Sequence, residues 1–313
     1  MSKPVLFVSF RDLMRAENLR AIYDAYTGPK VYINKLSPNY KEELLSGKYD
    51  LMVTDDLTDI SPGKCIVVWH GIHGGKTVGL DQPGHPYFHP AFTKHITRIV
   101  SAGRGTVQLW HQCTGVPTEH ILPLGFPRTD AYLGKHKGDG HTRLADKRAY
   151  LYVPTFREPT ETSLPNIDWE FLDNNLADNE ILAVKPHPVT GPMHLTGYRH
   201  IIELPSSSPS APYLYDADVV ITDYSSIMFD AYLLGIPVVL FEKQRGYEHT
   251  RGMYFRYPDF YSSRYAQTEY DLLNTLSDTF CMTETEYNCI ETVADACDGH
   301  SCERIIKLIE EMR

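Results

Sequence analysis

Short apolar runs alternate with amphipathic stretches along the first half of the chain. Pro4–Phe10 has the pattern of a buried strand, and Asp12–Tyr26 carries apolar side chains at helical spacing until Gly28 ends it. The other apolar runs of this half predict strands at Val31–Ile33, Leu51–Thr54, Cys65–Trp69, Ile99–Ser101 and Ile121–Leu124. Strands that alternate with helices predict a parallel sheet whose two faces are covered.

The same alternation starts again after a polar stretch without apolar periodicity, Gly134–Lys147, which has the composition of an interdomain linker. Strands are predicted at Ala149–Val153, Ile181–Val184, His200–Leu204, Asp218–Thr222 and Val238–Phe241. Helices are predicted at Ile167–Leu176, Ile227–Leu234, Glu269–Leu276 and Ser301–Met312. We therefore expect an α/β protein of two βα domains that face each other across a cleft, with domains over residues 1–134 and 149–313 and a linker over 135–148.

Composition and charge narrow the class of protein. With 313 residues, 42% apolar and 22% charged, the chain suits two globular domains and not a disordered, collagenous or coiled-coil protein. The net charge of -10 argues against a general nucleic-acid binder. Residues 1–148 hold 19 basic and 14 acidic side chains, whereas the rest hold 11 and 26. An anionic surface or lipid is therefore expected to meet the first half.

The cysteines, the N-terminus and the apolar runs favour a cytoplasmic protein. Six cysteines include no C-x-x-C pair, so we expect reduced cysteines and no zinc site. The N-terminus lacks the pattern of a signal peptide. The longest apolar region, Ala217–Phe241, is interrupted by three aspartates and a proline and cannot span a bilayer. Any membrane contact is expected to be peripheral, at the inner face of the membrane.

The tripeptide Trp69-His70-Gly71 ends a predicted strand. His70 is thus expected where an α/β sheet opens onto its ligand crevice, and Gly71 lets the backbone approach a ligand. A neutral imidazole there could remove a proton from an acceptor hydroxyl. The alternative is a histidine that only caps the strand end by hydrogen bonding.

Two segments of the second half follow strands in the same way. Lys185 and His187, in a Lys-Pro-His-Pro turn, could both donate to phosphate oxygens, although such turns are common after strands. Asp223-Tyr224-Ser225-Ser226 lies between a strand and a helix, so Ser225 or Ser226 would be the N-cap. The helix start then offers free N–H groups to an anion; the alternative is a capped helix without a ligand.

Two arginines and one acidic pair complete the candidates. Thr155 and Arg157 follow the strand that begins the second domain, and Arg251 lies in a polar loop after a later strand. Both arginines could hold phosphates bidentately, or form surface ion pairs. Asp216-Ala217-Asp218 looks like a metal motif, but it precedes its strand. Because ligands gather at the other end of strands, we expect this pair to be structural and predict no metal.

Together these motifs resemble the CDP-glycerol glycerophosphotransferase family, the teichoic-acid primases and polymerases. The resemblance rests on six motifs in one order: Trp69-His70-Gly71 with Lys76 and Gly79, Gly125–Asp130, Val153–Arg157, Lys185-x-His187-Pro188, Ile221–Ser226, and Arg251-Gly252-x-Tyr254. After Trp-His-Gly the family usually has Thr-Pro-Leu-Lys, whereas this chain has Ile72–Lys76, in a loop expected to face the acceptor.

The resemblance implies a GT-B-like fold of two Rossmann-type domains, the N-terminal one on the acceptor side and the C-terminal one binding the CDP donor. It implies transfer of a polyol phosphate, most simply glycerol phosphate, from a CDP-polyol to a hydroxyl of a glycan or lipid-linked acceptor, with release of CMP and without a metal or cofactor. In this reading His70 is the base and His187 contacts the donor phosphates. The implied substrate-binding residues are Gly71, Lys76, Thr155, Arg157, Lys185, Asp223, Ser225, Ser226 and Arg251.

The expected role is in the synthesis of a teichoic-acid or capsule-type polymer, by single transfer rather than processive synthesis. Two alternatives stay open at this point. One is a GT-B sugar transferase or sugar-nucleotide epimerase, which would use a similar phosphate cradle for another reaction. The other is a non-catalytic nucleotide-binding module, which would bind CDP without turnover.

Overall fold

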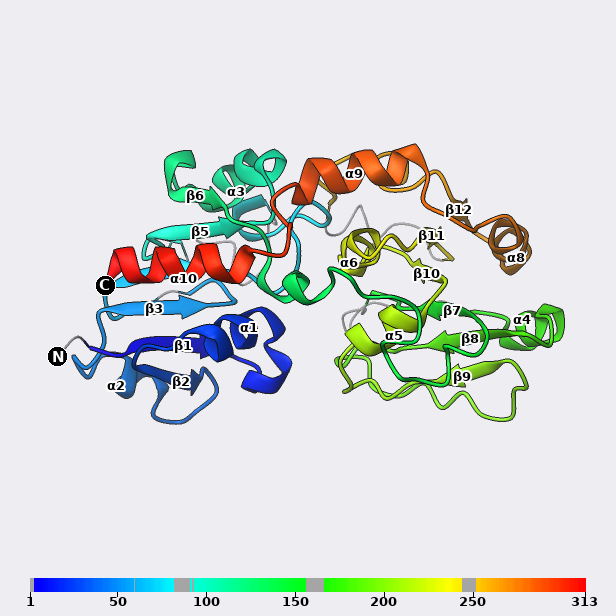
Figure 1. Cartoon of the computed structure of the whole chain (residues 1–313), viewed down its shortest axis with the longest axis horizontal. Coiled ribbons are helices and arrows are strands. Elements are labelled where there is room, and N and C mark those ends of the chain that lie inside the picture. Colours follow the sequence, from blue (N-terminus) through cyan, green and yellow to red (C-terminus); the bar gives the residue numbers. More distant parts are fainter. Residues whose placement is uncertain (1–2, 59, 82–90, 92, 156–165, 244–251) are drawn as a thin grey trace. The chain divides into compact units, whose positions relative to one another are not determined.

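The computed structural model describes residues 3–58, 60–81, 91, 93–155, 166–243 and 252–313 (Figure 1). Contacts within the chain divide it into two compact units. The first unit comprises residues 1–133 and 291–313, and the second comprises residues 134–290. Each unit is built on its own parallel sheet.

The first sheet has the strand order β2-β1-β3-β4-β5-β6. Its strands are β1 (Val5–Ser9), β2 (Lys30–Asn34), β3 (Leu51–Thr54), β4 (Lys64–Val67), β5 (Arg98–Ser101) and β6 (Ile121–Pro123). All pairings are parallel, and Phe7 of β1 lies in register with Tyr32 on one side and Val53 on the other. Each predicted strand of this half is confirmed. β4 ends two residues earlier than expected, because Trp69 adopts a φ of +44°.

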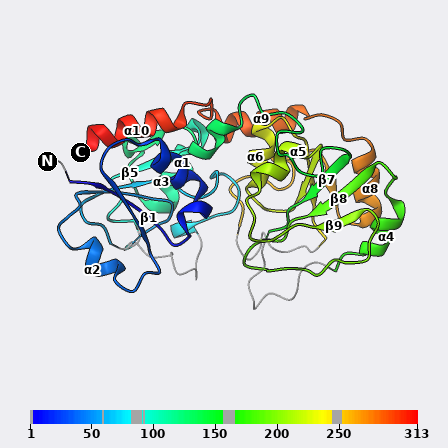
Figure 2. The ribbon, with the colours of Figure 1, turned by 60° about the horizontal axis from the view of Figure 1, so that its bottom comes forward.

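The helices of the first unit include α1 (Glu17–Ala25), α2 (Tyr40–Leu44), α3 (Val107–Thr114) and α10 (Ser301–Met312). In Figures 1 and 2, α10 (red) runs beside α1 and the first sheet. Ile305 and Ile309 of α10 share a buried core with Leu19 of α1 and Phe7 of β1. The expectation that everything after residue 149 belongs to the second domain was therefore wrong. An amphipathic pattern fixes which face of a helix is buried, but not which core it joins.

The motif Gly125–Asp130 is where α10 docks. The Asp130 carboxylate accepts hydrogen bonds from the Ser301 N–H at 3.0 Å and from the Cys302 N–H at 2.7 Å, which caps the helix N-terminus. Gly125 has a φ of +91°, and a Cβ there would lie 2.3 Å from Ser301 Oγ. Glycine at this position thus allows the close approach that brings the end of the chain onto the first unit.

The second sheet has the strand order β12-β11-β10-β7-β8-β9. Its strands are β7 (Arg148–Tyr152), β8 (Glu180–Val184), β9 (Ile201–Glu203), β10 (Val219–Thr222), β11 (Val238–Phe241) and β12 (Tyr265–Ala266). The helices of this part of the chain include α4 (Trp169–Asn175), α5 (Ala211–Asp216), α6 (Ile227–Leu233), α8 (Glu269–Ser277) and α9 (Glu284–Ala294). The predicted strands are confirmed, whereas β12 and the helices α2, α3, α5 and α9 were not predicted. The division between the two units falls within α9.

The stretch predicted as a linker is packed onto the second unit. Asp216, at the end of α5, accepts hydrogen bonds from the N–H groups of Gly138 and Gly140 and from both the N–H and the hydroxyl of Thr142. Burial opposes ionisation, but these bonds hold the pKa of Asp216 below its usual value. Leu144 is fully buried. The polar composition of this stretch therefore reflects bound turns and not a free connection.

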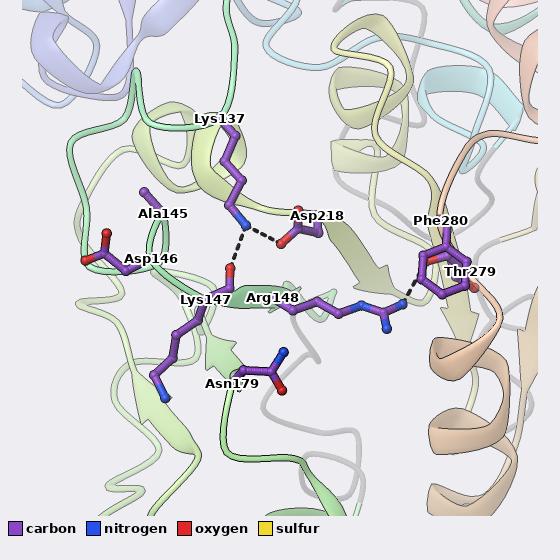
Figure 3. A pocket seen from close by; sticks show the side chains of 9 residues that line it. All are labelled: Lys137, Ala145, Asp146, Lys147, Arg148, Asn179, Asp218, Thr279 and Phe280. Atoms are coloured by element: carbon purple, nitrogen blue, oxygen red, sulfur yellow. Dashed lines mark hydrogen bonds and ion pairs between the residues drawn. The ribbon is translucent and has the colours of Figure 1, made fainter.

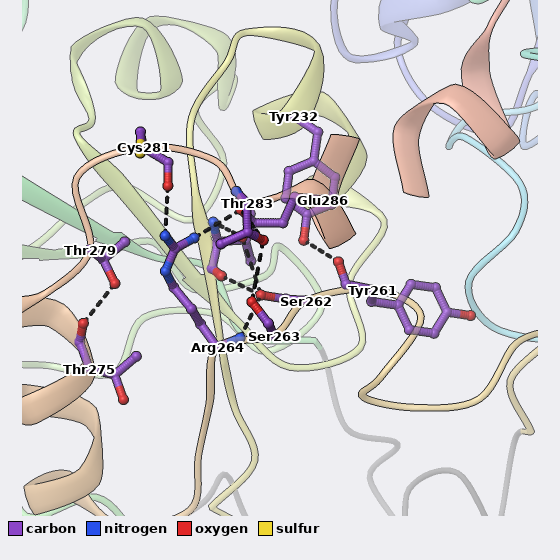
Figure 4. Close-up of polar contacts among 11 residues, drawn as sticks. Tyr232, Tyr261, Ser262, Ser263, Arg264, Thr275, Thr279, Cys281, Thr283 and Glu286 are labelled. Carbon is purple, nitrogen blue, oxygen red and sulfur yellow. Dashed lines mark hydrogen bonds and ion pairs between the residues drawn. The ribbon is translucent and has the colours of Figure 1, made fainter. Parts of the chain in front are cut away.

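A buried glutamate on α9 organises the amino end of β11 (Figure 4). Glu286 has no exposed surface and accepts from the Val238 N–H, from Ser262 Oγ and from Arg264 Nη1. The Thr283 N–H donates to it at 2.7 Å. A buried carboxylate is tolerated only when its lone pairs are occupied in this way. α9 is thereby fixed to the second sheet through its first turns.

Within the part of the chain that the structure describes, no helix has both the length and the apolar character needed to cross a membrane.

Candidate functional site

His70 lies at the carboxyl edge of the first sheet, just after β4. Its Nδ1 is 3.2 Å from the main-chain oxygen of Asp55, the residue that directly follows β3. A carbonyl oxygen can only accept, so Nδ1 carries the proton and Nε2 of the neutral ring keeps its lone pair. A general base needs a nitrogen with a free lone pair, and in this tautomer Nε2 is that nitrogen.

The surroundings of His70 keep its ring neutral. The ring is half-buried, and burial together with the positive charges of Arg11, Arg128 and Lys76 holds the pKa of His70 well below its usual value. The hydrogen bond to Asp55 acts in the opposite direction and is outweighed. His70 is therefore deprotonated, and able to accept a proton, throughout the physiological pH range.

The turn that carries His70 is held by two distant segments. Asn18 of α1 donates to the Trp69 carbonyl at 3.0 Å and accepts from the Arg128 N–H at 3.0 Å. The Arg128 side chain donates to the His70 carbonyl at 2.8 Å. The Trp69 ring lies against the His70 ring, with centroids 4.3 Å apart. These contacts explain how a non-glycine residue with positive φ is maintained before the histidine.

The glycine-rich loop after His70 is tightly packed. Gly71 is buried, and Gly74 has a φ of +126° with only 2.8 Å between an added Cβ and Val293 Cγ1. Lys76 is partly exposed at the end of this loop. His73 is buried and stacks on Trp110 at 4.1 Å, and burial lowers its pKa to about 3. Of the two histidines in this loop, His70 is thus the one with access to solvent.

His187 lies at the carboxyl edge of the second sheet, after β8. The Val189 N–H donates to its Nδ1 at 3.1 Å, so in the neutral ring Nε2 carries the proton. Lys185 is buried, and its ammonium group donates to the Ser206 carbonyl at 3.2 Å. The two candidate histidines therefore have opposite tautomers, with an acceptor at Nε2 of His70 and a donor at Nε2 of His187.

Asp223 joins the ends of two strands in the second unit. Its Oδ1 accepts from the Thr155 N–H at 2.8 Å and from the Tyr224 N–H at 2.7 Å. Asp223 and Thr155 are both buried. These two residues thus shape the sheet edge beyond β7 and β10, with most of their surface turned away from solvent.

The two serines that follow lie at the start of α6. Ser226 is the N-cap residue but its side chain makes no capping hydrogen bond, and Ser225 Oγ accepts from the Ile227 N–H at 3.4 Å. Both serines are partly exposed. Their hydroxyls are thus available at the carboxyl edge of the second sheet. Arg157 and Arg251, the two predicted arginines, lie outside the described residues.

Sequence reasoning missed two buried acids at the same sheet edges. Asp55 follows β3, and Glu242 follows β11, where it accepts from the hydroxyls of Tyr224 and Tyr265. Tyr257 packs against Tyr224, with ring centroids 4.7 Å apart. An acidic residue directly after an apolar strand was the available signal for both acids.

A cavity of about 520 Å³ opens at the other edge of the second sheet (Figure 3). Arg148, Asn179 and Asp218, which line it, stand at the amino ends of β7, β8 and β10. Its cationic groups are engaged: Lys137 pairs with Asp218 at 2.5 Å, and Arg148 donates to the Leu276 carbonyl at 2.9 Å. This cavity is therefore separate from the carboxyl-edge residues described above.

The model of the family described as CDP-Glycerol:Poly(glycerophosphate) glycerophosphotransferase matches residues 30–311. The chain belongs to this family. The match covers both units and includes the turns that carry His70 and His187.

Curated relatives of this family are similar at low identity. The teichoic acid poly(ribitol-phosphate) polymerase of Bacillus spizizenii is 26% identical over 263 residues, which are 78% of this chain and 42% of the relative. The teichoic acid glycerol-phosphate primase of Bacillus subtilis is 25% identical over 278 residues, 83% of this chain and 71% of the relative. The chain thus spans less than half the length of the first relative.

Solved structures agree on the fold. The wall teichoic acid polymerase TagF superposes with a TM-score of 0.79 at 20% identity, over 99% of this chain and 89% of the TagF chain. A TagF structure from a CDPG soak superposes with a TM-score of 0.75 at 21% identity, over 99% of this chain and 88% of the TagF chain. The UDP-GlcNAc 2-epimerase of Neisseria meningitidis superposes with a TM-score of 0.59 at 11% identity, over 99% of this chain and 100% of the epimerase chain. The predicted GT-B-like fold with two Rossmann-type sheets is confirmed.

Proposed function

We propose that the protein transfers a polyol phosphate, most simply glycerol phosphate, from a CDP-polyol to a hydroxyl group of a glycan or lipid-linked acceptor and releases CMP. The polymer made is of the teichoic-acid or capsule type. The observation that carries the proposal is the pair of opposite histidine tautomers. The reaction needs one group that accepts the proton of the attacking hydroxyl and one group that donates a hydrogen bond to the diphosphate. Family membership and the TagF structure obtained with CDPG support the choice of donor.

In this proposal the first unit supplies the base. Nε2 of His70 removes the proton of the acceptor hydroxyl as the hydroxyl oxygen attacks the β-phosphorus of the donor. A new phosphorus–oxygen bond forms, the bond from that phosphorus to the bridging oxygen breaks, and CMP leaves with the bridging oxygen. Gly71 and Lys76 lie beside the acceptor, and the low pKa of His70 keeps its ring ready to accept the proton.

The second unit holds the donor. The Nε2–H of His187 and the ammonium group of Lys185 donate to the diphosphate, joined by Ser225 and Ser226. These groups offset the charge that accumulates on the leaving CMP, so catalysis rests on positioning and electrostatics. Thr155 and Asp223 shape the sheet edge on which the donor lies. Arg157 and Arg251 are proposed as further ligands of the donor phosphates.

Contact with an anionic membrane surface through residues 1–148 is part of the same proposal, because that half carries the basic surplus.

A donor panel tests the proposal. CDP-glycerol, CDP-ribitol and UDP-sugars are offered with glycan and lipid-linked acceptors, and CMP is measured by chromatography. His70→Ala should lose roughly 10²–10⁴ in rate, the usual worth of a general base, while CDP affinity in calorimetry stays unchanged. His95→Ala, at a half-buried histidine before β5, is the control and should keep wild-type turnover.

The outcomes separate the alternatives. Near wild-type CMP release by His70→Ala contradicts the assignment of the base. Turnover of a UDP-sugar without CMP release from any CDP-polyol would indicate a sugar transferase or epimerase instead. CDP binding without turnover of any donor would indicate a nucleotide-binding module.

A further inference from the structure

Arg11 and Asp55 form an incompletely satisfied ion pair beside His70. Arg11 lies just beyond β1, Asp55 directly follows β3 and His70 follows β4, and these strands are neighbours in the parallel sheet. Arg11 Nη1 is 3.6 Å from Asp55 Oδ2, which also accepts from Ser9 Oγ at 3.1 Å. Among the described residues neither Asp55 Oδ1 nor Arg11 Nη1, both buried, has a hydrogen-bond partner.

Such a pair is a poor device for stability. Buried charges with unsatisfied polar atoms cost free energy, and apolar residues in their place often stabilise a protein. The Asp55 side chain is only 1% exposed, so the pair has little water to compensate for the missing bonds. Its position next to His70 therefore suggests a role in the site.

The pair acts on the imidazole of His70 by two routes. The main-chain oxygen of Asp55 accepts from Nδ1 of His70, which sets both the ring orientation and the tautomer. The charge of Arg11 also reaches the ring, since it contributes to the lowered pKa of His70. An ionised Asp55 carboxylate offsets that charge, and Ser9 and Arg11 hold the residue in place.

We propose that Asp55 is the positioning residue of His70: its ionised carboxylate anchors the carbonyl that orients the imidazole and neutralises Arg11, which would otherwise weaken His70 as a base. The catalytic part of this inference rests on the proposed function, whereas the structural part does not. No contact between Asp55 and the substrate is needed.

Protonation of Asp55 would remove this support. Burial raises the pKa of Asp55 to about 6, the neighbouring Asp56 adds to the rise, and Arg11 and Ser9 oppose it. Asp55 therefore changes charge in a pH range where His70 remains neutral.

The other charged and titratable groups around Asp55 and His70 come from five segments of the first unit. They are Arg11, Tyr32, Asp56, Lys76 and Arg128. Tyr32 does not titrate in this range, because burial and the charges of Asp55 and Asp12 raise its pKa to about 12. Asp56 is ion-paired with Lys35 at 3.1 Å. Lys76 and the arginines are the cations that an ionised Asp55 opposes.

NMR of the imidazoles in the unliganded full chain tests the structural part without any substrate. His70 is assigned by the ¹⁵N signals that disappear in His70→Gln. The wild type should carry the ring proton on Nδ1 and show a shift of its ring signals centred near pH 6 while the ring stays neutral. Asp55→Asn should lose this inflection. Arg11→Gln should move it to higher pH, because Arg11 lowers the pKa of Asp55.

The rate of CMP release tests the catalytic part. In Asp55→Asn, kcat should lose its fall below about pH 6, and at pH 8 it should drop roughly ten- to hundredfold, less than the roughly 10²–10⁴ lost with the base itself. The KM for the CDP-polyol should not change. The matched control is Asp56→Asn, which removes an adjacent, equally buried carboxylate that pairs with Lys35 instead. It should keep the fall in kcat at low pH, moved to somewhat lower pH because the charge of Asp56 adds to the raised pKa of Asp55.

Two results would overturn the proposal: an inflection near pH 6 that persists in Asp55→Asn, or equal effects of Asp55→Asn and Asp56→Asn on the pH profile. If Asp55→Asn does not fold, Arg11→Gln decides, because the Arg11 side chain is 29% exposed and its removal should be tolerated; an unmoved inflection then overturns the proposal. Absence of turnover with every CDP-polyol, together with an inflection that follows Asp55, refutes the proposed function and supports the role of Asp55 toward His70.

Discussion

The main-chain N–H of Val189 lies 3.1 Å from Nδ1 of His187 and can only donate to it. The proton of the neutral His187 ring therefore sits on Nε2, where it can be offered to an anion. At His70 a main-chain carbonyl takes the corresponding place and reverses the tautomer. One family-typical histidine is thus prepared as a donor and the other as an acceptor by their backbone partners alone.

His187→Ala should weaken CDP binding, because it removes that donor. A hydrogen bond to a charged group contributes roughly 1.5–3 kcal/mol, and calorimetric titration with CDP measures the loss. His187→Gln should retain part of the affinity, since its amide also offers an N–H. His194→Ala, at an exposed histidine of the same loop, is the control and should bind CDP as the wild type does. Unchanged affinity in His187→Ala would contradict the assignment.

Ser226→Ala should lower CDP affinity with little effect on stability, because the Ser226 side chain makes no capping bond. Thr268→Ala is the matched contrast. Thr268 Oγ1 accepts from the Asp271 N–H at 3.1 Å and caps α8, so its loss should cost about 1 kcal/mol of stability and leave CDP binding unaffected. Thermal melts and titration with CDP distinguish the two. A drop in melting temperature for Ser226→Ala without a change in affinity would show that Ser226 serves only the helix.

CMP release should continue in EDTA. The acidic pair that could have suggested a metal site is used within the second unit: Asp216 binds the turns at residues 138–142, and Asp218 Oδ2 accepts from the Ala149 N–H at 2.8 Å. Asp216→Asn should therefore lower the melting temperature and leave kcat unchanged. Activity that is abolished by EDTA and restored by magnesium would show that these carboxylates, or others, hold a metal.

The sheets could be predicted from the sequence because buried parallel strands are short apolar runs. Leu51–Thr54 was placed without error, and the positions of His70 and His187 after their strands followed from the same runs. The partner of α10 could not be predicted. Its apolar pattern shows which face is buried but not against which core. In the structure it packs on the first unit, where Asp130 caps it and Gly125 allows its close approach, and both of these residues are distant from α10 in sequence.

The finer structure of the site was beyond the sequence for a different reason. The two tautomers depend on main-chain partners at Asp55 and Val189, and neither partner is a side chain that a motif could display. Asp55 itself follows an apolar run, but aspartate is common in turns after strands, so its burial next to Arg11 gave no distinguishing signal. A side chain that acts on its neighbour through a main-chain group can therefore be recognised only when the fold is known.

The raised pKa of Asp55 also predicts how its replacement changes stability with pH. The folded pKa is about 6, whereas an unfolded aspartate has a pKa of about 3.9. Between these values the folded state binds more protons than the unfolded state, so ionisation of Asp55 lowers the stability of the wild type as the pH rises. The total effect is about 3 kcal/mol; it develops from about pH 4 upward and is complete by about pH 7. Asp55→Asn has no ionisable side chain at this position, so its free energy of unfolding should not fall in this way as the pH rises.

The free energy of unfolding of Asp55→Asn should therefore rise relative to wild type between pH 4 and pH 7. Urea titrations followed by tryptophan fluorescence measure it, in a Trp169→Phe background that leaves Trp69 and Trp110, both in the first unit, as reporters. Asp50→Asn is the control: this exposed carboxylate pairs with Lys3 at 2.8 Å, and its loss should change stability by less than about 1 kcal/mol at every pH. A difference between Asp55→Asn and wild type that stays constant with pH would mean that Asp55 ionises as easily in the folded protein as in the unfolded chain, and would remove the basis for its pH-dependent control of His70.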